Sequence, residues 1–226
     1  MSGAGWLLVP AAVWAGYTWG SHLFPLGGLR RAPARARAVA LTFDDGPDPD
    51  TTPRVLDLLA EHGVRGAFFL VGRRAARAPG VAQRIVREGH DLGNHTLSHR
   101  SLWLCGPRAT AREVRGGHEA VAQAAGQAPG FFRPPWGLTN LALFPLLREL
   151  GTPCVLWSVQ PESRRAVPAA RQVEHARGRV GAGAILDLHD ADGVPGAGTR
   201  LVEALPALIR TLRADGYTLA PLRDLR

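Results

Sequence analysis

Lysine is absent from this chain of 226 residues, so its 27 positive side chains are all arginines and the formal net charge is +8. The arginines are spread along the whole chain without interleaved aromatic residues, and no nucleic-acid-binding module is recognisable. Nucleic acid is therefore not an expected partner, whereas an anionic membrane surface or wall polymer fits the charge. Nothing in the composition indicates disorder or a fibre, and the length suits one domain with a sizeable core.

Cysteine is scarce as well. The two cysteines, Cys105 and Cys154, lack the close spacing of a zinc-binding motif, and the sequence alone does not pair them. We expect both to be free and buried.

Acidic and basic side chains are missing from the first 29 residues. The stretch "GWLLVPAAVWAGYTWGSHLFPLGGL" is long enough for one membrane helix, with Trp6 and Trp19 as interface anchors. We predict a membrane anchor at 1–29 and a basic linker at 30–38. A signal peptide cleaved after Ala15 and an amphipathic or buried leader remain alternatives. The arginines after the apolar run favour a cytoplasmic domain by the positive-inside rule.

From Val39 onward, short apolar runs alternate with amphipathic stretches. "VALTF", "GAFFLVG", "GFFRP" and "AILDLHD" are typical of strands, and the segments between them are typical of helices. "TARE", from Thr110 to Glu113, has the pattern of a capping box that opens a helix ending at Gly126. This alternation predicts a parallel α/β sheet, open or closed into a barrel. In such folds the carboxyl ends of the strands line the site.

Two adjacent carboxylates, Asp44 and Asp45 of "TFDDGP", follow the first of these strands. An Asx turn is one interpretation. The sequence "HTLSH" after another strand favours a second one, because His95 and His99 share a face if that segment is helical. Two histidines and one aspartate would make a zinc-like site with an open water position. The other aspartate would then be the general base. A pair of hydrogen-bonded surface histidines is the alternative.

Two further ionisable residues stand at expected strand ends. Arg133 of "RPPW" lies among apolar residues, where it could form a structural ion pair or hold an acidic base ionised and oriented. His189 of "LDLHD" could be a core histidine bonded to a carbonyl, or an acid that protonates a leaving amine.

These motifs resemble, in letters, order and spacing, those of the polysaccharide deacetylase family, whose NodB homology domain removes N-acetyl or O-acetyl groups from sugar polymers. The resemblance runs from about Val39 to about Leu222, and "RPPW" differs from the usual form only in having Trp136 for Tyr or Phe. It implies an irregular, incomplete (β/α) barrel over 39–226, preceded here by the apolar N-terminal helix. By similarity, the base is Asp44, oriented by Arg133, and the acid is His189. The metal ligands would be Asp45, His95 and His99, and the substrate pocket would be shaped by Pro135, Trp136, Leu186 and Leu188.

One motif departs from the family. After "LWSV" the family has an aspartate pair and a tryptophan, and its second aspartate pairs with the catalytic histidine. Here Gln160, Ser163 and Arg164 stand at those places. We expect a weaker acid at His189 unless Glu162 or Asp190 supplies the carboxylate.

The resulting hypothesis is a hydrolase that depends on one divalent metal, zinc by preference, and removes acetyl groups from N-acetylated amino sugars of a cell-wall or exported polysaccharide. The protein would be a single-pass membrane protein with its domain outside the cytoplasm, since the substrate argument outweighs the charge rule in so arginine-rich a chain. An O-acetyl esterase with the same machinery and a membrane-tethered glycan-binding module are the alternatives.

Overall fold

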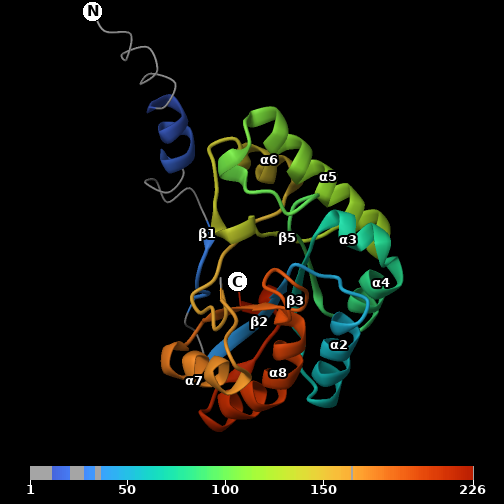
Figure 1. Cartoon of the computed structure of the whole chain (residues 1–226), viewed down its shortest axis with the longest axis vertical. Helices are drawn as coiled ribbons and strands as arrows, with labels where there is room; N and C mark the ends of the chain where they lie inside the picture. The colour runs from blue at the N-terminus through green and yellow to red at the C-terminus, as the bar shows by residue number, and fades with distance from the viewer. Residues whose placement is uncertain (1–11, 21–27, 34–36, 164, 226) are drawn as a thin grey trace, which may run out of the picture.

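The computed structural model describes residues 12–20, 28–33, 37–163 and 165–225. Its centre is a curled parallel sheet with helices packed around the outside (Figure 1). The strands are β1 (Gly28–Leu29), β2 (Ala38–Asp44), β3 (Ala67–Leu70), β4 (Asp91–Asn94), β5 (Phe131–Phe132), β6 (Cys154–Val155), β7 (Ile185–His189) and β8 (Thr218–Leu219).

Helices alternate with these strands along the chain, as the sequence predicts. They are α2 (Thr51–Glu61), α3 (Gly72–Arg77), α4 (Pro79–Arg87), α5 (Pro107–Ala125), α6 (Leu143–Leu150), α7 (Ala169–Arg179) and α8 (Ala197–Ala214). The short 3-10 turns are η1 (Leu102–Leu104), η2 (Pro135–Gly137) and η3 (Leu222–Leu225). Because each crossover joins neighbouring parallel strands, the chain carries β2 to β6 around the sheet in order.

The sheet forms an incomplete barrel. Its strand order is β1-β6-β5-β4-β3-β2-β7, with β8 added beside the start of β2, and all these pairings are parallel. The open side is narrowed by single bridges to β7, from Val159 after β6 and from Arg31 after β1. The predicted (β/α) architecture is therefore confirmed as a curled half-barrel. Its sheet begins at Gly28, before the predicted domain start at residue 39, and the domain boundaries stay a prediction.

The strands divide their side chains between two faces. In β2, Leu41 and Phe43 join the main hydrophobic core with residues of α2 and α8, whereas Ala40 belongs to a smaller cluster with Phe69 of β3. Thr42 and Asp44 share the face of Ala40 because side chains alternate along a strand. Both bond the same buried guanidinium, which fills the interior of the half-barrel. The polar site is thus built on the inner face.

The N-terminal segment differs from the prediction. Residues 12–20 are helical, and Tyr17 lies against the domain, with its hydroxyl donating to the carbonyl of Cys105 (3.3 Å). Nine helical residues rise about 14 Å, less than half the hydrocarbon thickness of a bilayer. Among the described residues, no helix has the length and apolar character needed to cross a membrane. This finding overturns the predicted single-pass localisation; residues 1–11 and 21–27 lie outside the described residues.

The predicted capping box at Thr110 is also wrong. Helix α5 begins three residues earlier, at Pro107, and Thr110 is buried inside it with its hydroxyl bonded to the Cys105 carbonyl. Glu113 turns away from the helix and accepts hydrogen bonds from the backbone N–H and hydroxyl of Ser98 (2.9 and 2.8 Å). The pattern therefore holds the loop that follows β4 rather than a helix end.

Candidate active site

Ionisable side chains converge at the carboxyl end of the sheet. Asp44 is the last residue of β2 and lies directly opposite His189, the last residue of β7, in the parallel register. Asp45 follows with a left-handed backbone, φ 74°, which turns its side chain toward the site. Among described non-glycine residues, this conformation occurs only at Asp45, Thr96, His99 and Trp136. Strained backbone of this kind is typical of functional sites.

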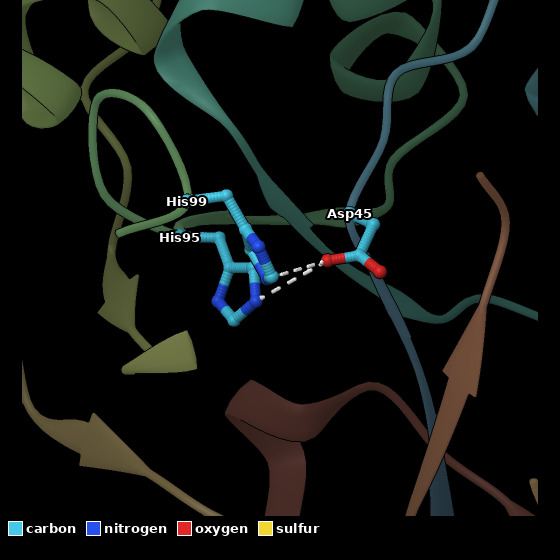
Figure 2. A group of neighbouring side chains, drawn as sticks. All are labelled: Asp45, His95 and His99. Atoms are coloured by element: carbon cyan, nitrogen blue, oxygen red, sulfur yellow. Dashed lines mark ion pairs between the residues drawn. The ribbon is translucent and has the colours of Figure 1, made fainter. Parts of the chain in front are cut away.

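The residues Asp45, His95 and His99 form the one cluster of metal-ligand type among the described residues. Their donor atoms all lie within 4.8 Å of one another. Asp45 Oδ1 is 2.9 Å from His99 Nε2 and 3.6 Å from His95 Nε2, and all three side chains point toward one another (Figure 2). The histidines come from a loop, not from the helix whose face they were expected to share, and positive φ angles at Thr96 and His99 bring them together.

The arrangement fits a zinc-like ion. His95 Nδ1 is 2.7 Å from the carbonyl of Arg133, which fixes the ring so that Nε2 faces Asp45. Burial lowers the pKa of His95 to about 4, so its imidazole is neutral. Burial works to raise the pKa of Asp45, but the hydrogen bond and charge of His99, with His95 and His189, hold it well below its usual range. A neutral imidazole and an ionised carboxylate are the forms that bind metal.

Arg133 is fully buried and anchors the neighbouring acid. Its Nη1 donates to Asp44 Oδ1 (2.7 Å) and to the hydroxyl of Thr42 (2.7 Å), and its guanidinium lies over the Phe69 ring at 4.1 Å. The other oxygen of Asp44, Oδ2, is 3.7 Å from His95 Nε2. Asp44 therefore stands beside the three-residue cluster with one oxygen held by Arg133 and the other turned toward the cluster.

His189 lies across the site from these groups, with its side chain well buried. Burial alone would lower its pKa, but the facing carboxylates of Asp187, Asp45, Asp44 and Glu162 raise the pKa of His189 above the ordinary value. A raised pKa keeps an imidazole protonated at neutral pH, as a general acid requires.

A cavity of about 440 Å³ opens over these residues. Asp44, Asp45, His95, His99 and His189 line it, together with Trp136, Trp157, Gln160, Ser163, Asp187, Asp192, Gly193 and Val194. Trp136 is 49% exposed and its ring lies 4.6 Å from that of His99, so an aromatic face stands at the cavity edge. Pro135 is buried beside it in η2.

Two residues expected in the pocket lie elsewhere. Leu186 and Leu188 belong to the main hydrophobic core, and neither lines the cavity. Strand alternation explains this placement, because residues of β7 separated by two share a face. The face that turns inward carries Asp187 and His189 instead. This placement disagrees with the predicted role of the leucines, and it reveals Asp187, which the motif reading passed over although the period-two pattern of "LDLHD" indicates it.

The altered segment after β6 contributes directly to the cavity. Gln160 and Ser163 line it, while Arg164 lies outside the described residues. Gln160 Nε2 donates to Asp187 Oδ2 at 2.7 Å. Burial and the neighbouring Asp44 carboxylate raise the pKa of Asp187 to about 7.

Both cysteines are free and buried, as expected. Burial raises the pKa of Cys154 to about 12, so its thiol is unreactive. Cysteine chemistry therefore plays no part in the site.

Comparison with known proteins identifies the family. The family model for polysaccharide deacetylases matches residues 31–155, more than half of the chain. This chain belongs to the polysaccharide deacetylase family. It is 35% identical to a chitooligosaccharide deacetylase of Bradyrhizobium sp. (strain ANU 289), over 91% of this chain and 99% of that protein. It is 33% identical to a peptidoglycan-N-acetylglucosamine deacetylase of Bacillus cereus, over 85% of this chain and 90% of that protein.

Solved structures agree with this assignment. A crystal structure of a peptidoglycan N-acetylglucosamine deacetylase superposes with a TM-score of 0.82 at 32% identity, covering 87% of this chain and 91% of that one. The fold also occurs, at 21% identity and a TM-score of 0.80, in a Bacillus anthracis protein described as a family pseudoenzyme, covering 89% of this chain and 69% of that one. Within the polysaccharide deacetylase family, the fold alone therefore does not establish turnover, and the site residues carry the argument.

Proposed function

We propose that the protein is a metal-dependent deacetylase that hydrolyses the N-acetyl groups of amino sugars in a polysaccharide or oligosaccharide. The observation that carries the proposal is the placement of Asp44 and His189 on opposite sides of the Asp45, His95 and His99 cluster in one cavity. An acid and a base facing one bond from two sides are what amide hydrolysis requires. Relatives that act on chitooligosaccharide and on peptidoglycan N-acetylglucosamine support the choice of substrate.

The donor set of two histidines and one carboxylate suits zinc among the common divalent metals. A divalent ion held there supplies Lewis-acid polarisation of the acetyl carbonyl and lowers the pKa of water. Because three protein ligands leave positions open, substrate and water have room at the site. The neutral His95 and the low pKa of Asp45 favour metal binding at ordinary pH.

The remaining chemistry falls to the surrounding side chains. Asp44, held by Arg133, accepts the proton of the attacking water. His189 gives a proton to the sugar nitrogen as the carbon–nitrogen bond breaks, so the products are acetate and an amino sugar. The left-handed turn at Trp136 presents backbone at the cavity edge, where an amide N–H can stabilise the oxyanion. The Trp136 ring offers an apolar face for the sugar.

Acetate release from chitin oligosaccharides, peptidoglycan and acetylxylan, each with and without a chelator, tests the proposal. We expect release from the first two substrates, its loss with chelator, and its return with Zn²⁺. Release from acetylxylan alone would identify an O-acetyl esterase on the same machinery. Glycan binding without any acetate release would identify a binding module.

A further inference from the structure

His189 requires an anionic neighbour in order to stay protonated, and the altered segment after β6 provides none in the usual place. The groups that face it are Asp44 and Asp45 at the end of β2, Glu162 after β6 and Asp187 within β7. Asp44 and Asp45 are engaged by Arg133 and by the two histidines. Glu162, its chain neighbour Asp190, and Asp187 are therefore the side chains left for this task.

Glu162 is committed to another partner. Its Oε1 is 2.6 Å from Arg200 Nη2 and also accepts the backbone N–H of Val167 (2.9 Å), while Oε2 accepts from Gln172 (3.1 Å). These bonds hold the loop after β6 against α7 and α8. The carboxylate charge is thus largely balanced by Arg200.

Asp190 is directed away from the site. Its Oδ2 accepts a short hydrogen bond from the Thr52 hydroxyl at the start of α2, and its oxygens lie against Gly46, where a Cβ atom would clash. It does not line the cavity. Its place next to His189 in the chain puts its side chain on the opposite face of the strand.

Asp187 meets every geometric requirement. It lies two residues before His189 on the same strand face, it is 1% exposed, and it lines the cavity. Its Oδ1 is 3.3 Å from Nη1 of Arg133, the same nitrogen that binds Asp44. Its Oδ2 accepts from Gln160, so both oxygens are held.

Gln160 suits this role because its amide can donate to a carboxylate, whereas an aspartate at position 160 would repel Asp187. The altered segment and the inward acid therefore fit each other. We propose that Asp187 is a positioning residue, fixed by Gln160, that holds both the acid His189 and the base-orienting Arg133. The proposal rests on the proposed deacetylase function.

The first test replaces Asp187 by Asn in the zinc-loaded full-length chain. Asn keeps the size but loses the charge, so we expect kcat to fall roughly 10- to 100-fold with KM and zinc content little changed. The alkaline limb of the rate profile should move to lower pH, because His189 loses a negative neighbour and its pKa falls. Adding Ser163→Asp should raise kcat above that of Asp187→Asn, because Ser163 lines the same cavity and returns a carboxylate to it.

Asp91→Asn is the matched control. Asp91 is also a buried strand aspartate bound to an arginine, but it stands at the opposite end of the sheet. Its loss should lower thermal stability without changing kcat or the pH profile. Unchanged kcat and pH profile in Asp187→Asn, or losses that follow only the folded fraction, would overturn the proposal.

An NMR titration of the His189 ring in the parent and in Asp187→Asn gives a readout that needs no turnover. A lower pKa in the variant supports the proposal even if the parent releases no acetate, and in that case it is the proposed function that fails. An identical pKa in the two proteins would count against Asp187.

Discussion

The two ends of strand β4 make an instructive contrast. His90 and Asp91 stand at its amino end, whereas Asn94 and His95 stand at its carboxyl end. Burial lowers the pKa of His90 and of His95 to about 4 in both cases. His90 Nδ1 accepts the backbone N–H of Gly66 (3.1 Å), and His95 Nδ1 faces the Arg133 carbonyl. Equal pKa shifts therefore accompany different surroundings.

What separates the two histidines is the convergence of other donors. Around His95, the side chains of Asp45 and His99 lie within 4.8 Å with their lone-pair atoms directed inward. The nearest acid of His90 is Glu88, whose Oε2 is 3.9 Å from Nε2. A perturbed pKa marks burial in both places, and only the gathering of ligands from separate strand ends marks a site.

The contrast is broken most severely by replacing each histidine with Ala. We expect His95→Ala to lose zinc and all measurable acetate release, because two ligands hold a divalent ion far less well than three. His90→Ala should keep both zinc content and kcat while lowering stability. Elemental analysis and kinetics on the folded proteins check this. Zinc and activity retained at wild-type levels in His95→Ala would place the metal elsewhere.

The two adjacent acids sharpen the comparison within the active end. Asp44→Asn should keep zinc while the rate falls by roughly two to four powers of ten, because an amide cannot accept the proton. Asp45→Asn should weaken zinc binding itself. Zinc titrations of the two variants with a competing chelator measure the difference. Equal loss of zinc affinity in both would contradict the separate roles.

The smallest expected effect concerns acid stability. The folded pKa of His90, about 4, lies below the unfolded value of about 6.5, so the unfolded chain binds more protons between these limits. Its contribution is therefore complete above pH 6.5 and is lost as the pH falls toward 4, at a cost of at most about 3 kcal/mol. His90→Gln should flatten this part of the profile. Urea unfolding from pH 4 to 8 measures it, and equal slopes in parent and variant would exclude His90 as the source.

Much of the fold was predictable because its local signals agree. Alternating strand and helix patterns after Val39 indicate a parallel α/β sheet, and polar residues after Phe43 and Leu188 mark the strand ends that carry the site. The motif residues Asp45, His95 and His99 meet as expected. Their assigned roles in binding and catalysis stay predictions.

The errors came from patterns that have two physical solutions. A run of apolar residues near the N-terminus fits a membrane helix or a short helix packed on a domain, and hydropathy does not distinguish them. Thr110 and Glu113 have the spacing of a capping box at any place in a helix, so the pattern did not reveal that α5 starts at Pro107. The histidine spacing fits a helix, yet a loop with two left-handed residues performs the task.

The sequence by itself determined the chemical groups of the site and their order along the strands, because residue type and periodicity are local properties. Tertiary structure alone decided which groups meet. The curl of the sheet turns Asp187 and His189 inward and buries Leu186 and Leu188 in the core. It also commits Glu162 to Arg200 and brings Gln160 to Asp187, since such pairings depend on chain segments that only folding places side by side.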